Sequence, residues 1–221
     1  MVLMQHFLDP RDLRRLGTQY EPDEIPSVAV CKFGYYPDIS ALQPGDLILV
    51  HNLHGNFSHK IIEQVQARAY QPEHSKWHHA AVYLGYSDDI CEADLAGVCT
   101  NSLDRYAYGN HLIRIRRGRD LDESTRWRIA IRALTRLRQS YSYSTILDTG
   151  YLAIKRFKQH GPIKRTSNSG LICSQLYSDA YQTATRTMLA NRKCNEVTPA
   201  FLSSTKSLED VPLTWRPLAQ F

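Results

Sequence analysis

The sequence lacks the features that would assign it to several familiar classes of protein. No apolar run approaches the roughly 20 residues that cross a bilayer, so we expect no transmembrane segment. The first residues lack a basic stretch followed by a long apolar core, so we expect no secretory signal. Neither C-x-x-C nor H-E-x-x-H occurs, and we expect no metal and no cofactor.

Cysteine is scarce and scattered along the chain. The sequence has five cysteines, an odd number, and their spacing indicates no disulfide framework. Disulfides are rare in proteins of reducing compartments. We therefore expect a protein made in the cytoplasm.

The remaining composition is that of an ordinary globular protein. The chain has 221 residues, of which 43% are hydrophobic, and shows no repeat and no low-complexity tract. This length allows one domain with a sizeable core. We predict a single domain over residues 1–221, of α+β class, with an irregular N-terminal lead-in over residues 1–40.

Positive charge is in mild excess and gathers in one predicted helix. The net charge is +5, and arginines recur through the helix expected over residues 121–140. The pattern predicts one apolar face toward the core, made by Trp127, Ala130, Ile131, Leu134 and Leu137. It places a stripe of Arg128, Arg132 and Arg136 away from that face. A solvated helix face explains this pattern, and an anionic partner is the alternative. We expect no nucleic-acid partner, because no recognised motif is present.

The most informative residue is Cys173, which the pattern places in the first turn of a helix. Ser167, Asn168 and Ser169 are good N-cap residues, and apolar residues follow at helical spacing to about Leu189. A helix N-terminus favours a thiolate over a thiol. Cys173 is therefore a candidate nucleophile, although an inert core cysteine is the alternative.

A short apolar strand over residues 80–84 carries the candidate partners of this thiol. His79 stands at its entrance, and Gly85 ends it. A second strand over residues 90–93 returns after a turn and can set Glu92 beside His79. Nucleophile, base and orienting acid form the triad of cysteine hydrolases. His78 competes with His79, but neighbouring strand residues point to opposite faces, so only one can meet Cys173.

Further elements follow from the same patterns. We expect strands over residues 46–50, 98–100 and 112–115, and helices over residues 9–15, 58–69 and 145–157. Together they predict a small, largely antiparallel sheet packed with helices.

Four short runs resemble the NlpC/P60 superfamily of papain-like cysteine hydrolases. The run from His79 to Gly85 resembles its H-V-G-I-Y-L-G strand, and Cys173–Leu176 resembles its C-S-G-L helix start. Residues 43–50 and 198–202 resemble its P-G-D strand entry and its T-P-x-x-L segment. Because histidine precedes cysteine here, the resemblance is to the circularly permuted, YiiX-like branch, and it implies a permuted papain-like fold.

This resemblance implies a set of site residues. Cys173 would be the nucleophile, His79 the base and Glu92 the third polar residue. Tyr143, His78 and Ser174 would contribute to substrate binding. Two departures from the family stand out: Ile172 replaces a frequent aspartate, and Glu92 stands where many relatives have histidine.

The resemblance also implies an activity and partners. We expect cleavage of amide bonds, foremost in peptidoglycan peptides, with lipid acyl hydrolase, thioesterase or acyltransferase activity as the alternative. An antibacterial effector, exported without a signal peptide to a target periplasm, would reconcile a wall substrate with the cytoplasmic expectation. Such an effector would have an immunity protein or a secretion adaptor as a partner.

Two hypotheses of other classes stay open at this point. The chain can be a non-catalytic binding module that keeps the fold. Alternatively it can be a metal-dependent hydrolase, because six of the nine histidines lie in the span from His51 to His79. Thiol reactivity distinguishes the first from an enzyme, and loss of activity with a chelator would favour the second.

Overall fold

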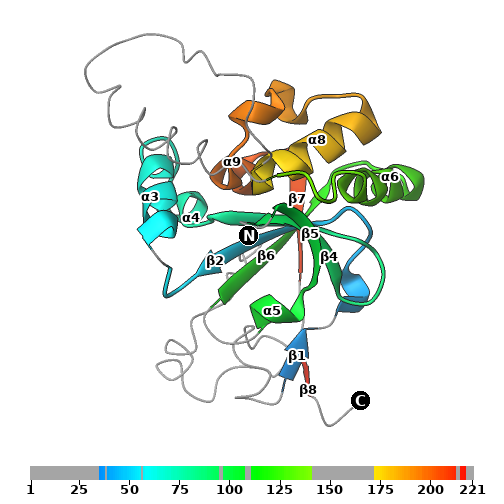
Figure 1. Ribbon diagram of the computed structural model, residues 1–221, viewed down its shortest axis with the longest axis horizontal. Coiled ribbons are helices and arrows are strands. Elements are labelled where there is room, and N and C mark those ends of the chain that lie inside the picture. The colour runs from blue at the N-terminus through cyan, green and yellow to red at the C-terminus, as the bar shows by residue number, and fades with distance from the viewer. Residues whose placement is uncertain are drawn as a thin grey trace.

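A six-stranded antiparallel sheet forms the centre of the protein, and helices pack against it (Figure 1). The computed structural model describes residues 35–37, 39–55, 57–94, 97–107, 111–140, 172–212 and 215–217. The strand order is β5-β4-β3-β2-β6-β7. The strands are β2 (Leu47–Asn52), β3 (His79–Tyr83), β4 (Asp89–Asp94), β5 (Gly97–Ser102), β6 (His111–Gly118) and β7 (Leu208–Val211). The architecture is therefore α+β.

The helices are of two kinds. The longer ones pack around the sheet, and the others are single helical turns in the loops that connect its strands. In Figure 1, α6, α8 and α9 lie together on one side of the sheet. The helices are α3 (Phe57–Gln66), α4 (Pro72–Ser75), α5 (Asp104–Ala107), α6 (Glu123–Leu134), α8 (Cys173–Thr185) and α9 (Pro199–Ser204). Three 3₁₀ turns add η3 (Ile39–Ala41), η4 (Leu189–Asn191) and η5 (Cys194–Glu196).

The core lies between the sheet and α8. Residues 47–50 of β2 and 80–82 of β3 are buried on both sides, as expected for continuous apolar runs in central strands. Helix α8 packs on β3 and β4, and α6 packs on α8. The helix that carries Cys173 is thereby fixed against the strands that carry His79 and Glu92.

Gln66, at the end of α3, fixes the approach to β3. Its buried side-chain amide donates to the carbonyl oxygens of Ser75 (2.9 Å) and Trp77 (2.7 Å). The amide oxygen accepts from the backbone N–H of Ala200 in α9 at 2.8 Å. One satisfied side chain therefore joins α3, the segment before His78 and α9.

Most of the predicted elements are present. The five expected strands are confirmed as β2 to β6, and the helices expected over residues 58–69, 121–140 and 173–189 are confirmed with shorter bounds as α3, α6 and α8. The helices expected over residues 9–15 and 145–157 lie outside the described residues. Within the predicted lead-in, β1 (Tyr35–Pro37) pairs with β8 (Trp215–Pro217), so this part is not irregular.

The predicted orientation of α6 is right for Ala130 but wrong for its large apolar residues. Ile129, Ala130 and Ala133 are its buried residues, whereas Trp127 and Ile131 are 39% and 56% exposed. In this orientation Arg132 and Arg136 both reach Asp179 of α8, the latter at 2.9 Å.

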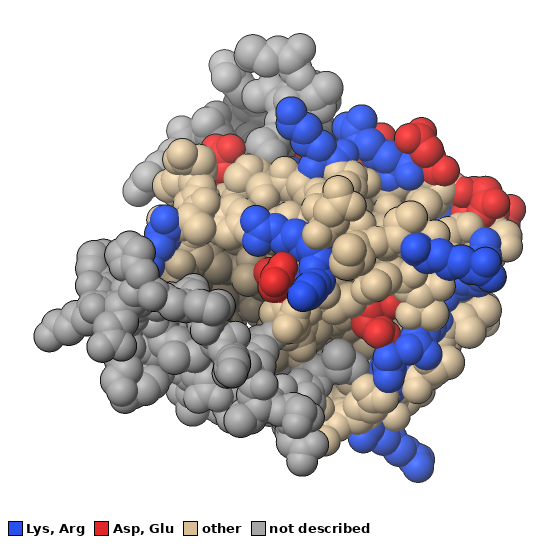
Figure 2. Space-filling view, turned by 90° about the horizontal axis from the view of Figure 1, so that it is seen from above, with Lys and Arg blue, Asp and Glu red and all other residues tan. Residues whose placement is uncertain are grey.

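Those two arginines therefore serve helix packing rather than a free basic surface. On the face drawn in Figure 2, Lys and Arg side chains are spread out and interspersed with acidic ones. Among the described residues, no helix is long and apolar enough to cross a membrane. The four described cysteines, Cys91, Cys99, Cys173 and Cys194, are free thiols.

Candidate active site

His79 and Glu92 meet across two neighbouring strands. Glu92 pairs with Ala81 in the β3–β4 register, which places it diagonally beside His79 on the same face of the sheet. The Nε2 atom of His79 lies 2.6 Å from Glu92 Oε2. Glu92 is fully buried, whereas the His79 side chain is 16% exposed. The acid therefore lies behind the imidazole, away from solvent.

Cys173 approaches the same imidazole from α8. It is the first residue of that helix, and its thiol lies close enough to interact with the His79 side chain. The Sγ atom also lies 4.0 Å from the backbone oxygen of His78. The three residues that the sequence predicts as a triad therefore come together from α8, β3 and β4.

Four donors surround the Glu92 carboxylate. His79 and the Tyr106 hydroxyl donate to Oε2. Asn101 Nδ2 (2.7 Å) and Arg105 NH1 (2.5 Å) donate to Oε1. An ionised carboxylate offers about four lone-pair sites, so each has a donor. This arrangement satisfies a charge that would be costly to bury unpaired.

The ionisation of the pair follows from these contacts. Burial alone would lower the pKa of His79, but its hydrogen bonds to Cys173 and Glu92, and the negative charge of both groups, raise that pKa to about 10. Burial alone would raise the pKa of Glu92, but the hydrogen bond and charge of His79 lower it to about 2. Near neutral pH the site therefore holds an imidazolium against a carboxylate.

The hydrogen bonds also define the role of each imidazole nitrogen. Glu92 is ionised and accepts only, so Nε2 of His79 must carry a proton and donate. The remaining nitrogen, Nδ1, is left to exchange a proton with Cys173. This is the division of labour that a general acid–base needs: one nitrogen anchored, the other facing the nucleophile.

The start of α8 is built differently from the prediction. Ser167, Asn168 and Ser169 were expected as N-cap residues, but the helix begins at Cys173 with Ile172 at the N-cap. Gln175 compensates, because its side-chain oxygen accepts from the backbone N–H of Ile172 at 3.4 Å. Cys173 therefore lies at the first helical position, where backbone N–H groups lack intrahelical acceptors.

Of the three residues predicted to bind substrate, the side chains of the two that the structure describes do not join this cluster. Ser174 is fully buried, and its hydroxyl donates to the backbone oxygen of Val197 at 2.8 Å, which is a packing role. His78 points to the other face of β3 and is 5% exposed. Tyr143 lies outside the described residues.

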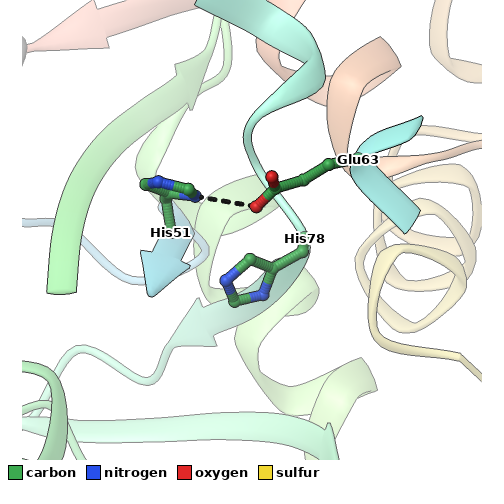
Figure 3. A group of neighbouring side chains, drawn as sticks. All are labelled: His51, Glu63 and His78. Atoms are coloured by element: carbon green, nitrogen blue, oxygen red, sulfur yellow. Dashed lines mark ion pairs between the residues drawn. The ribbon is translucent and has the colours of Figure 1, made fainter. Parts of the chain in front are cut away.

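A second histidine cluster lies on that other face (Figure 3). His51 and Glu63 are joined through Nδ1 and Oε1 at 3.2 Å, and His78 lies beside them. The ring of His59 stacks on His78 with centroids 3.9 Å apart. Burial, followed by the charge of neighbouring imidazoles, lowers the pKa of His78 to about 2, so this ring is neutral.

The hydrogen bonds of this cluster do not fit a metal ion. His51 Nδ1 lies 2.8 Å from the Lys76 carbonyl oxygen, so it must carry the proton. His78 Nε2 accepts from the Asn52 N–H at 2.6 Å, which leaves the proton of the neutral ring on Nδ1. The lone pair of His78 is thus already used, which leaves His51 Nε2 and the Glu63 carboxylate as the donors of this cluster, one fewer than the three protein ligands of a catalytic zinc site. A second group, Glu92, Asp94 and Cys99, lies close together, but Arg105 already supplies a cation to both carboxylates.

Sequence reasoning missed the donors around Glu92. Asn101 lies one residue before the end of β5, and Arg105 and Tyr106 lie in α5, a single helical turn before β6. Such a turn is too short to show an apolar periodicity, so the sequence pattern did not predict it. The available signal was local: Ser102 and Asp104 near its start are typical helix-capping residues.

In comparisons with known proteins, no family model matches the sequence, and no curated protein matches it.

Proposed function

We propose that this protein is a cysteine hydrolase in which Cys173 is the nucleophile, His79 the general acid–base and Glu92 the residue that orients His79. The observation that carries the proposal is the contact of the Cys173 thiol with an imidazole whose far nitrogen is bound to a buried carboxylate. The raised pKa of His79 supports it further, because an imidazolium stabilises a neighbouring thiolate.

The first half of the reaction acylates the thiol. The Cys173 sulfur attacks the carbonyl carbon of an amide, a C–S bond forms, and the oxygen takes up the negative charge. Backbone N–H groups at the start of α8, including that of Cys173, are candidates to stabilise this oxyanion, at about 3 kcal/mol per donor. His79 then gives its Nδ1 proton to the leaving nitrogen, the C–N bond breaks, and an acyl thioester remains.

The second half returns the enzyme to its starting state. Neutral His79 takes a proton from a water molecule, whose oxygen attacks the thioester carbonyl. The C–S bond breaks, the acid product leaves, and the Cys173 thiolate pairs again with the His79 imidazolium. Glu92 keeps its charge throughout and stabilises the imidazolium in both halves.

We further propose a fold and a substrate class, both of which rest on the sequence resemblance. The antiparallel sheet, with histidine in an early strand and cysteine in a later helix, is compatible with the permuted branch of the NlpC/P60 superfamily. Amide bonds in peptidoglycan peptides are the proposed substrate, and lipid acyl groups are the alternative that the test below separates.

Digestion of purified peptidoglycan, read by mass spectrometry of the released fragments, tests this function. We expect new peptide termini with the native protein and none with Cys173→Ala. Cys194→Ala is the matched control, because Cys194 contacts Gln182 away from His79. Release of fatty acid from phospholipid vesicles, without peptide cleavage, would move the substrate to lipid. Undiminished cleavage by folded Cys173→Ala would overturn the mechanism.

Thiol labelling tests the nucleophile without any substrate. We expect iodoacetamide to modify Cys173 faster at neutral pH than the other described thiols. Burial raises the pKa of Cys91 to about 12 and also raises that of Cys99, so both remain thiols. Peptide mapping after brief labelling measures the order, and equal labelling of Cys173 and Cys194 would favour a non-catalytic binding module.

A further inference from the structure

Tyr106 lies behind the proposed triad, where no sequence pattern assigned it a role. It comes from α5, is 9% exposed, and donates its hydroxyl to Glu92 Oε2. The same oxygen accepts from His79 Nε2. The Tyr106 ring also lies 5.9 Å from the His79 ring, centroid to centroid. Tyr106 therefore touches both members of the acid–imidazole pair.

We propose that Tyr106 is a positioning residue for this hydrolase, acting through Glu92. Its hydroxyl holds Glu92 Oε2 in position to accept the hydrogen bond from His79 Nε2, and it keeps the buried carboxylate ionised. The inference deepens the proposed function and depends on it for its catalytic meaning, although the control of Glu92 by Tyr106 can be measured without catalysis.

The arrangement of donors explains why one hydroxyl matters. Asn101 and Arg105 hold Oε1, so Glu92 cannot rotate and exchange its two oxygens without breaking both bonds. With Oε1 fixed, the direction of Oε2 depends on its two remaining partners, His79 and Tyr106. Without the Tyr106 hydroxyl, His79 would be the only partner of Oε2. Glu92 would then no longer hold His79 in a fixed orientation.

Tyr106 is suited to act as a permanent donor. Burial, followed by the charge of Glu92, raises the pKa of the phenol well above its usual range, so the hydroxyl keeps its proton wherever the enzyme works. Arg105 lies over the Tyr106 ring at 5.4 Å and covers the Glu92 side of the site. The charged or titratable groups around Glu92 are His79, Cys173, Tyr106, Arg105, Asp94 and Cys99.

The short helix that carries Tyr106 is anchored to the hairpin that carries Glu92. Asp88, in the turn between β3 and β4, accepts from the Ser102 hydroxyl and from the backbone N–H of Leu103. Ser102 in turn accepts from the N–H of Asp104 at 3.0 Å. The position of Tyr106 is therefore tied to the same strands that present His79 and Glu92.

The decisive experiment compares Tyr106→Phe with Tyr83→Phe. Tyr83 is the matched control, because it is also buried and its hydroxyl donates to the Ser87 carbonyl oxygen at 2.6 Å, away from Glu92. We expect Tyr106→Phe to lower kcat about tenfold with KM unchanged, and Tyr83→Phe to change neither more than about twofold. Thermal unfolding of both variants shows whether a loss is merely structural.

A double-variant comparison shows whether Tyr106 acts through Glu92. If it does, adding Tyr106→Phe to Glu92→Gln costs nothing further, so the double variant should match Glu92→Gln within about twofold. Independent, multiplying losses would overturn the proposal. So would an unchanged kcat in Tyr106→Phe.

A spectroscopic measurement keeps the inference testable apart from catalysis. The proton between His79 Nε2 and Glu92 should give a low-field NMR resonance, and we expect Tyr106→Phe to shift or broaden it while Tyr83→Phe leaves it in place. An unmoved resonance in folded Tyr106→Phe would refute the positioning role. If the native protein hydrolyses nothing yet the resonance moves, the proposed function fails and the control of Glu92 by Tyr106 stands.

Discussion

His78 and His79 are adjacent in the chain, yet they differ in almost every physical property. His79 contacts a carboxylate and a thiol, and its pKa is raised to about 10. His78 lies on the other face of β3 among other imidazoles, and its pKa is lowered to about 2. Both are largely screened from water, so burial does not separate them. The comparison shows that the ionisation of a buried histidine is decided by the charge it faces.

The largest expected effect comes from replacing His79, the charged histidine of the two. His79→Gln should abolish hydrolysis, by a factor of about 10³ or more, because it removes the proton carrier of both half-reactions. His78→Gln should keep activity within about tenfold, because that ring contacts only structural groups. Steady-state kinetics of the two variants, with circular dichroism to verify folding, makes the measurement. Equal losses would show that the two faces act together.

Removing the negative charge of Glu92 should lower the pKa of His79, in the direction of the low pKa of His78. The hydrogen bond of Cys173 and then that of Glu92 raise the pKa of His79, and Glu92→Gln removes the charge of the second partner, so we expect that pKa to fall from about 10 and kcat to drop about 100-fold. The imidazolium, which persists in the native protein until the pH rises through about 10, should then disappear at a lower pH. An NMR titration of the His79 ring records the shift, and an unchanged titration would contradict the assignment of Glu92.

A smaller effect should appear in stability. The pKa of His79 is raised on folding, so its stabilising contribution is complete below the unfolded value of about 6.5 and is lost as the pH rises toward the folded value. We expect the free energy of unfolding of the native protein to fall by on the order of 2 kcal/mol across this window. Urea unfolding at several pH values measures it. His79→Gln should flatten the profile.

The smallest effect concerns the His51–Glu63–His78 cluster. Because the hydrogen bond from Asn52 already uses the lone pair of His78, which leaves only His51 and Glu63 as donors, dialysis against a chelator should change activity by less than twofold. Elemental analysis of the purified protein provides the companion measurement. Stoichiometric zinc, together with inactivation by the chelator, would favour the metal-dependent hydrolase instead.

The sequence predicted the parts of the site that lie on regular elements. The apolar run after His79, ended by Gly85, identified β3, and the apolar residues at helical spacing after Cys173 identified α8. Gly85 has a φ of +86°, a backbone conformation that favours glycine, which explains why the strand stops there. These signals are local, and the diagonal contact of His79 with Glu92 follows from hairpin geometry alone.

Other parts could not be predicted because they depend on contacts between distant segments. Apolar spacing alone wrongly placed the large apolar residues of α6 inward, and the ion pairs of Arg132 and Arg136 with Asp179 are invisible in one helix. The helical turns α4 and α5 have no periodicity to detect. Tyr106 reaches Glu92 only because the segment after β5 folds back over the hairpin.

The crowding of donors around Glu92 has a consequence for how this protein can change over time. Aspartate is one methylene shorter and could not reach all four donors at once, while glutamine would turn an N–H group toward at least one of them. A substitution of Glu92 alone therefore leaves at least one buried donor without an acceptor. A tolerated substitution requires that its donors be replaced at the same time. In diverged descendants we expect positions 92, 101, 105 and 106 to vary as a group or not at all.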